Sequence, residues 1–273
     1  MFNYNTPIEE YTVGKKTVYV KRDDMFGQPP APALAKLRGI TKYVEKAEQK
    51  GIKILGDLDT RVSKSGWGLA CACQNTSITP YVFYPQLKAE TQMPFIQTRA
   101  LNLGAKVIPL KAGRTSVLYA QATRKIQKLG GTMLPMGLTL KETVDEVAKV
   151  INDTPRELLT GTIITTTGTS TIASGIVKGL IQNNIKPKQF YGVSCGMSNY
   201  KQAKVMERLL SEYYPVKIPR WVQFVLPEFE YYDASDIKVP FPCSPYYDRK
   251  GWIWLNRYIK HLKSPILFWN VGD

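Results

Sequence analysis

The sequence predicts an α/β protein with parallel sheets flanked by helices, and three observations lead to this prediction. Short β-branched and apolar runs alternate with helical patterns of about ten to fifteen residues, which is typical of βαβ units. The chain has 273 residues and 44% apolar content, enough to build one substantial domain or two packed lobes. It has no internal repeat, low-complexity segment or Gly/Ser linker, so two lobes would be interleaved in the sequence.

The first half of the chain contains five predicted strands, which cover residues 17–20, 52–56, 78–84, 104–110 and 132–137. The predicted helices between them cover residues 36–47, 69–73, 95–103 and 116–129. Apolar residues at helical spacing define the first of these helices, and Gly51 ends it.

The second half of the chain continues the same alternation. Its predicted helices cover residues 141–152, 172–181 and 200–213, and its predicted strands cover residues 161–166, 191–195 and 265–269. The strand at residues 161–166 has the β-branched content expected of a buried strand.

Composition limits the kinds of chemistry that the protein can perform. No apolar run reaches membrane-spanning length and no signal-peptide pattern is present, so we expect a soluble, cytoplasmic protein. The single histidine, His261, makes a histidine-based triad or metal centre a poor candidate. The cysteines suggest neither a disulfide framework nor a zinc site; they are Cys71, Cys73, Cys195 and Cys243. Catalysis would therefore use lysine, hydroxyls, carboxylates or a cofactor, and we expect no metal.

The formal net charge of +15 indicates a polyanionic partner. The charge is spread along the chain instead of being gathered in one tail, and we expect contact with nucleic acid. The alternative is a generally basic surface with no such partner.

Lys36 is a candidate nucleophile at the start of a predicted helix. Its neighbours Leu34, Ala35 and Leu37 are apolar, so burial and the helix dipole should both lower the pKa of its amine. A lysine that is neutral part of the time can attack an aldehyde and form a Schiff base. The alternative interpretation is one ordinary surface lysine among many.

The segment at residues 165–171 is a candidate anion site. A β-branched strand runs into Thr167-Gly168-Thr169-Ser170-Thr171, and a helix with small residues follows. Such a turn can direct backbone N–H groups and hydroxyls at a phosphate near the positive end of the helix. The alternative is a hydroxyl-rich helix cap without a ligand.

The lysine segment resembles that of the fold-type II pyridoxal-phosphate enzymes. It reads K-R-D-D-M-F-G at residues 21–27 and A-K-L-R-G at residues 35–39. Lys36-x-Arg38-Gly39 is similar to the motif of serine racemases and threonine deaminases. The preceding strand is similar to that of 1-aminocyclopropane-1-carboxylate deaminases and D-cysteine desulfhydrases, although Ala35 stands where those deaminases have asparagine. The resemblance extends to the tryptophan synthase β-like group as a whole.

This resemblance implies a two-lobed fold and the cofactor pyridoxal 5'-phosphate, held by Lys36. The large cofactor-binding lobe would comprise residues 1–48 and 141–273, with a smaller lobe at residues 49–140 inserted in it. The loop at residues 167–171 resembles the family's T-G-S-G-G-T, which holds the cofactor phosphate. The implied phosphate ligands are Thr167, Gly168, Thr169, Ser170 and Thr171.

Ser63-Lys64-Ser65-Gly66 occupies the place of the family's Q-S-N-H or S-G-N-T loop, and the alternative is an ordinary capped helix start. The resemblance implies cofactor contacts for Lys64 and Ser65 and a catalytic role at the substrate for Ser63. Lys64 replaces the asparagine that meets the pyridoxal ring in the family.

Two further segments near the end of the chain resemble the family's site. In the aromatic, proline-rich loop at residues 240–248, Tyr246 or Tyr247 would be a second acid or base, and the alternative is a loop that serves packing alone. The closing L-F-W-N-V-G-D is similar to the family's L-F-I-H-T-G-G. Val271 stands where the threonine normally meets the pyridine nitrogen, so Asn270 is the implied replacement.

From these features we expect a pyridoxal-phosphate-dependent lyase or decarboxylase. The positive charge favours an amino acid attached to a nucleic acid base, such as a hypermodified thymine in viral DNA, processed by decarboxylation or elimination. We expect DNA contact, no membrane, a possible homodimer, and a host-cytoplasmic location if the source is viral. Two alternatives stay open: a deaminase or desulfhydrase of a free amino acid, and a non-catalytic nucleic-acid-binding protein on a degenerate enzyme scaffold.

Overall fold

The computed structural model describes residues 2–211, 218–226, 230 and 232–273. The chain forms two compact units. The small unit contains Pro29–Pro32 and Lys36–Glu142, and the large unit contains Phe2–Gln28, Ala33–Ala35 and Thr143–Asp273. The first helix thus groups with the small unit, and the division into lobes expected from the sequence stays a prediction.

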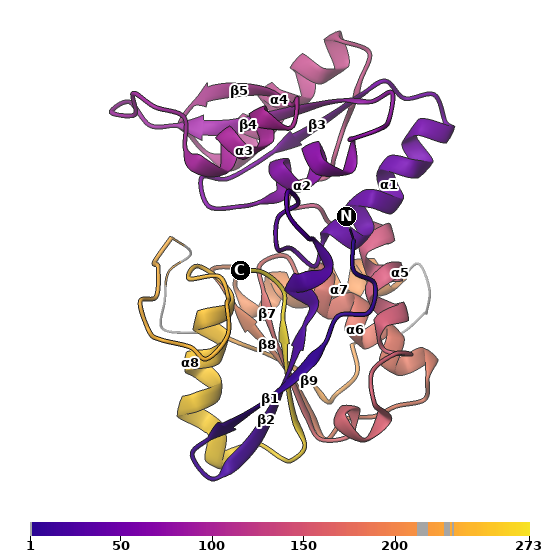
Figure 1. Ribbon diagram of the computed structural model, residues 1–273, viewed down its shortest axis with the longest axis vertical. Helices are drawn as coiled ribbons and strands as arrows, with labels where there is room; N and C mark the ends of the chain where they lie inside the picture. Colours follow the sequence, from indigo (N-terminus) through magenta and orange to yellow (C-terminus); the bar gives the residue numbers. More distant parts are fainter. Residues whose placement is uncertain (1, 212–217, 227–229, 231) are drawn as a thin grey trace. The chain divides into compact units, whose positions relative to one another are not determined.

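The large unit is built on a six-stranded sheet in the order β1-β2-β10-β7-β8-β9 (Figure 1). Its strands are β1 (Ile8–Val13), β2 (Lys16–Arg22), β7 (Thr162–Thr167), β8 (Gln189–Ser194), β9 (Val222–Val225) and β10 (Ile266–Asn270). Only β1 is antiparallel to its neighbour within this described sheet. The sequence prediction missed β1, which contains two glutamates and a threonine in six residues, and β9, which is only four residues long.

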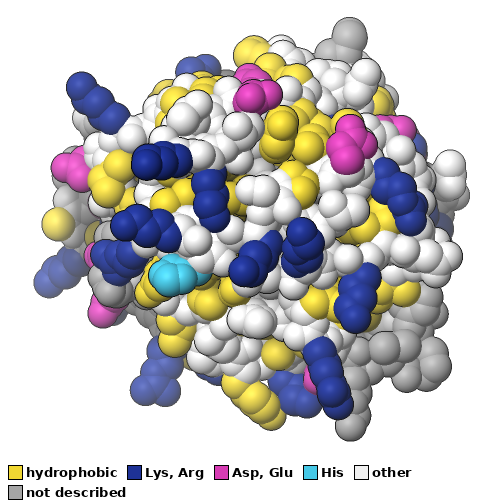
Figure 2. Space-filling view, turned by 90° about the horizontal axis from the view of Figure 1, so that it is seen from below, with side chains coloured by type: hydrophobic (Ala, Val, Ile, Leu, Met, Phe, Trp, Pro, Cys, Tyr) yellow, Lys and Arg dark blue, Asp and Glu magenta, His cyan; other side chains and the backbone are white. Residues whose placement is uncertain are grey.

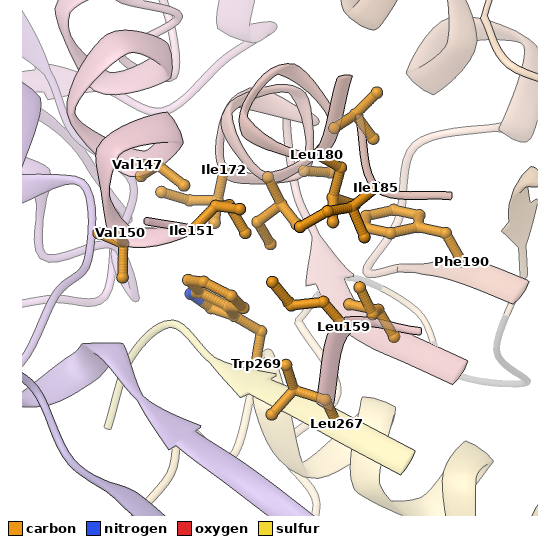
Figure 3. Close-up of a cluster of buried hydrophobic side chains, with 14 of the residues drawn as sticks. Val147, Val150, Ile151, Leu159, Ile172, Leu180, Ile185, Phe190, Leu267 and Trp269 are labelled. Carbon is orange, nitrogen blue, oxygen red and sulfur yellow. The ribbon is translucent and has the colours of Figure 1, made fainter. Parts of the chain in front are cut away.

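Both faces of this sheet are buried. Its helices are α5 (Lys141–Val150), which begins in the small unit, α6 (Thr171–Gln182), α7 (Asn199–Ser211) and α8 (Asp248–Tyr258). Side chains of α5, α6 and α7 pack on one face in the cluster around Trp269, which Figure 3 shows. Trp252 and Leu255 of α8 join the cluster on the other face. Adjacent strand residues such as Leu267 and Phe268 therefore belong to opposite clusters, as expected in a doubly covered parallel sheet.

The small unit has a parallel four-stranded sheet in the order β5-β4-β3-β6. Its strands are β3 (Ile54–Leu58), β4 (Thr79–Gln86), β5 (Lys106–Lys111) and β6 (Thr132–Met133). Its helices are α1 (Leu37–Gln49), α2 (Ser65–Ala72), α3 (Phe95–Asn102) and α4 (Thr115–Lys128).

The predicted parallel α/β architecture is confirmed, and the corrections concern element boundaries. β3 begins and ends two residues later than predicted, so Asp57 lies in the strand and not in the following loop. Helix α2 begins four residues earlier than predicted, at Ser65. The predicted end of α7, residues 212 and 213, lies outside the described residues. Among the described helices, none is both long and apolar enough to cross a membrane.

Candidate functional site

Lys36 immediately precedes α1, and its amine is held by the chain of its own unit. Its Nζ donates to the carbonyl oxygen of Gly137 at 2.6 Å. Gly137 and Leu138 both have left-handed backbones, with φ of 69° and 52°, so the turn after β6 directs this carbonyl at the lysine. Burial lowers the pKa of Lys36 to about 8, against the opposing effect of the nearby Asp57 carboxylate. The predicted fall of this pKa is confirmed, with burial as its main cause.

Two buried carboxylates lie at the carboxyl end of β3. Asp57 and Asp59 are 1% and 2% exposed, and the hydroxyl of Ser65 lies 2.6 Å from Asp57 Oδ2 and 2.9 Å from Asp59 Oδ1. The other oxygen of Asp59, Oδ2, accepts from Gln97 Nε2 at 3.1 Å and from the Gly66 amide at 3.3 Å. We call Asp57 and Asp59 the aspartate pair.

Both carboxyl groups of the aspartate pair have raised pKa values. Burial raises the pKa of Asp57 to about 6, and burial followed by repulsion from Asp57 raises the pKa of Asp59 to about 8. A hydroxyl has one proton to donate, so Ser65 can serve only one of the two carboxylates at a time. Because the pKa of Asp59 is raised more than that of Asp57, Asp57 is the more readily ionised of the two and can stabilise a positive charge on Lys36.

The structure brings Ser63 and Ser65 together with the aspartate pair. Ser63 Oγ lies 3.1 Å from Ser65 Oγ and accepts from the Ser65 amide at 3.2 Å. Lys64 is the half-buried residue before α2. The catalytic role expected for Ser63 and the cofactor contacts expected for Lys64 and Ser65 stay predictions. Sequence reasoning missed Asp57 and Asp59 because it placed both in a loop.

In the large unit, the Thr167–Thr171 segment joins β7 to α6. Ser170 has a left-handed backbone with φ of 56°, which turns the chain sharply into the helix. Gln202 of α7 fixes the segment: its Nε2 donates to the carbonyls of Thr167 and Gly168 at 3.0 and 3.1 Å, and its Oε1 accepts from Ser170 Oγ. The first amides of an α-helix have no partner within the helix, so those of α6 can bind an anion.

There is room beside this loop at Gly168. A Cβ added there would meet only the Tyr247 ring, at 3.7 Å, which is ordinary contact. The Thr169 and Thr171 hydroxyls bond each other at 2.9 Å. The structure therefore places Tyr247 next to the predicted phosphate loop. For Tyr246, which is also half-buried, the described residues give no such contact.

Asp248, the first residue of α8, is a further buried carboxylate that sequence reasoning gave no role. It is 0% exposed, and its Oδ1 accepts from Thr166 Oγ1 at 2.6 Å and from the Val271 amide at 3.1 Å. Burial raises the pKa of Asp248 to about 7. Within the described part of the chain, its Oδ2 has no hydrogen-bond partner.

Asn270 lies at the end of β10 in the same unit and is fully buried. Its Nδ2 donates to the Pro242 carbonyl at 3.0 Å, and its Oδ1 has no partner among the described residues. The role expected for Asn270 at the pyridine nitrogen stays a prediction. Asp248 is a second candidate for that role. In the sequence, it could have been noticed as a single acidic residue directly after Tyr246 and Tyr247.

No family model matches the sequence. The chain is 29% identical over 279 residues to a "Glycyl-dTMP PLP-dependent decarboxylase" of Pseudomonas phage M6, covering 98% of this chain and 99% of the relative.

Solved structures resemble the fold over nearly its full length. An ACC deaminase homologue superposes with a TM-score of 0.83 at 18% identity, covering 99% of this chain and 90% of that one. A hydrogen sulfide-producing enzyme from Fusobacterium nucleatum gives 0.67 at 15% identity, covering 98% and 94%. Threonine deaminase isoform 2 from Solanum lycopersicum gives 0.66 at 13% identity, covering 98% and 79%. The predicted fold-type II architecture is confirmed.

Proposed function

We infer that this chain is a fold-type II pyridoxal-phosphate enzyme that decarboxylates an amino acid attached to a thymine nucleotide. The full-length likeness to a phage decarboxylase of a glycyl nucleotide supports the substrate class. The geometric observation that carries the proposal is the buried Lys36 amine, held by Gly137 with a pKa of about 8. At that pKa roughly a quarter of the amine is neutral near pH 7.5, enough to react with an aldehyde.

The residues present fit pyridoxal 5'-phosphate. In the small unit, Lys36 would supply the amine. In the large unit, the loop after β7 would supply helix-start amides and hydroxyls for the phosphate, and Gly168 leaves space beside that loop. The buried and unpartnered oxygens of Asp248 and Asn270 suit a ring nitrogen, which is a donor when it is protonated. When bound, the cofactor supplies an electron sink that lets a bond at the substrate Cα break.

Lys36 has two tasks in this mechanism. Its amine would hold the cofactor. When the substrate carboxylate has left as CO₂, the bonding electrons remain at Cα, and the Lys36 ammonium donates a proton to that carbon. The ionised Asp57 favours the ammonium form needed for the second task.

Asp248 would set the strength of the electron sink. An ionised carboxylate stabilises a protonated ring nitrogen, whereas the amide of Asn270 carries no charge. Thr166 and the Val271 amide hold Asp248 in place, and both favour its ionised form.

The proposed activity can be tested with glycyl-dTMP and free glycine as separate substrates. We expect pyridoxal-phosphate-dependent release of CO₂ from glycyl-dTMP and at least a hundredfold lower kcat/KM for glycine, on the order of 3 kcal/mol of lost binding. Release of ammonia without CO₂ would instead support the deaminase alternative.

Gln202 is predicted to support cofactor binding indirectly, by fixing the phosphate loop. Gln202→Ala removes the side-chain partner of the Gly168 carbonyl and the Ser170 hydroxyl, while the Thr167 carbonyl keeps the Cys195 amide as a donor. We expect the Kd for pyridoxal phosphate to rise about tenfold to a hundredfold. Absorbance titration measures this Kd. Gln182→Ala, an exposed glutamine at the end of α6, is the matched control. An unchanged Kd in a folded Gln202→Ala protein would contradict the role.

DNA contact, the oligomeric state and the cellular location of the protein are proposals. We propose that the substrate thymine belongs to DNA at least part of the time, as the net charge of +15 favours. Assembly as a homodimer and location in the host cytoplasm stay predictions.

A further inference from the structure

The strands of the large sheet begin at a common edge, and basic residues gather there. β2, β10, β7, β8 and β9 are mutually parallel neighbours, so their amino ends lie together (Figure 1). Each of the five is preceded by at least one Lys or Arg. We call these residues the amino-edge row; they are Lys15, Lys16, Arg156, Lys186, Lys188, Arg220, Lys260 and Lys263.

The amino-edge row has a strong excess of positive charge. The segments that lead into the five strands are residues 14–16, 151–161, 183–188, 218–221 and 259–265. They contain these eight basic residues and two acids, Asp153 and Glu157. Seven of the eight basic side chains are exposed, and Lys16 is half-buried. Figure 2 views this end of the molecule, where Lys and Arg side chains outnumber Asp and Glu side chains. In the part of the chain that the structure describes, no member of the row forms an ion pair.

Hydrogen bonds connect several of the backbone segments that carry the row. Lys16 Nζ donates to the carbonyls of Lys260 and Leu262, and the Lys188 amide donates to the Thr160 carbonyl. The Lys263 amide donates to Thr162 Oγ1 at 2.8 Å. Because these bonds join the segments that carry the charges, the row has a fixed geometry and does not consist of independent flexible tails.

The length of the row matches a short stretch of a double helix. Five neighbouring strands at about 4.8 Å span about 19 Å. Duplex DNA rises about 3.4 Å per base pair, so the row spans between five and six base pairs, or roughly ten phosphates on two strands. A surface of this charge and length, with little acid and no ion pair among its described residues, suits a phosphodiester backbone better than a small anion.

We propose that the amino-edge row binds the phosphate backbone of duplex DNA. The choice of DNA over other polyanions rests on the proposed function. The row lies at the amino ends of the strands, whereas the loop after β7 lies at their carboxyl ends, so DNA bound there leaves the cofactor loop uncovered. The row would retain the enzyme on nucleic acid without acting in catalysis.

The test compares two sets of four charge reversals in the full chain. The edge variant carries Lys186→Glu, Lys188→Glu, Lys260→Glu and Lys263→Glu. The control carries Lys106→Glu, Lys111→Glu, Lys125→Glu and Lys128→Glu, four exposed lysines of the small unit. Both sets change the net charge equally. Fluorescence anisotropy measures binding to a labelled DNA duplex over a range of salt concentrations, and to anionic lipid vesicles in parallel.

We expect the edge variant to bind DNA at least about 30-fold more weakly and to lose roughly three to four units of salt slope, about one per lysine. The control should stay within about threefold of the wild type, because its lysines lie outside the row. Equal losses in both variants, no loss in the edge variant, or binding to vesicles but not to DNA would overturn the proposal. CO₂ release from glycyl-dTMP, measured separately, should be the same in the edge variant and the wild type, so failure of the proposed function is recognised independently.

Discussion

Lys36→Ala is expected to abolish the violet absorbance of bound pyridoxal phosphate and to reduce decarboxylation at least about a thousandfold. The substitution removes both groups proposed above, the amine that would hold the cofactor and the ammonium that would return a proton to Cα. The chain offers no substitute within α1, where the other lysines lie on the solvent-facing side, at Lys42 and Lys46. A visible spectrum with added cofactor, followed by a CO₂ assay, measures both effects.

Lys50→Ala provides the matched control for this prediction. Lys50 is an exposed lysine at the opposite end of α1, and we expect its replacement to change neither the spectrum nor the rate. If Lys36→Ala kept a wild-type absorbance band, Lys36 would not be the cofactor-binding residue. The non-catalytic nucleic-acid-binding alternative would gain support if the wild-type protein itself formed no band.

Asp248→Asn is expected to have opposite effects on activity and on stability. If Asp248 binds the ring nitrogen as proposed, loss of its charge should lower kcat on the order of a hundredfold. The same change should stabilise the protein without cofactor at about pH 8, since an amide needs no ionisation inside the core. Thr166 and the Val271 amide can still donate to the amide oxygen, so the fold should be retained.

The raised pKa of Asp248 makes the stability of the folded protein depend on pH. Folded Asp248 keeps its proton up to about pH 7, whereas the unfolded chain releases it near the ordinary pKa of 3.8. The unfolded state therefore binds fewer protons between these values, and stability falls as the pH rises from about 4 to about 7. This single group contributes up to about 4 kcal/mol of that fall.

Thermal unfolding of the cofactor-free proteins across this pH range measures the effect. We expect the wild type to lose stability as the pH rises and Asp248→Asn to lose less, the remainder coming from Asp57 and Asp59. Asp153→Asn, an exposed acid, should follow the wild type. Parallel curves for Asp248→Asn and the wild type would show that Asp248 is ionised at low pH in the folded protein.

The sequence determined by itself the features that depend on neighbouring residues. Alternating strand and helix patterns predicted the parallel α/β fold, because periodicity records which faces are buried. An apolar setting at a helix start predicted the lowered pKa of Lys36, and the run Thr167–Thr171 predicted a strand, a turn and a helix start where these occur. Motif order added the resemblance to pyridoxal-phosphate enzymes.

Only the tertiary structure decided which distant groups meet. Thr166 and Asp248 are 82 positions apart, and Gln97 and Asp59 are 38 apart, so no local pattern predicts either contact. The amino-edge row exists only because parallel pairing aligns strands from both ends of the chain. The raised pKa values of Asp57, Asp59 and Asp248 come from burial, which depends on the whole packed core and not on adjacent residues.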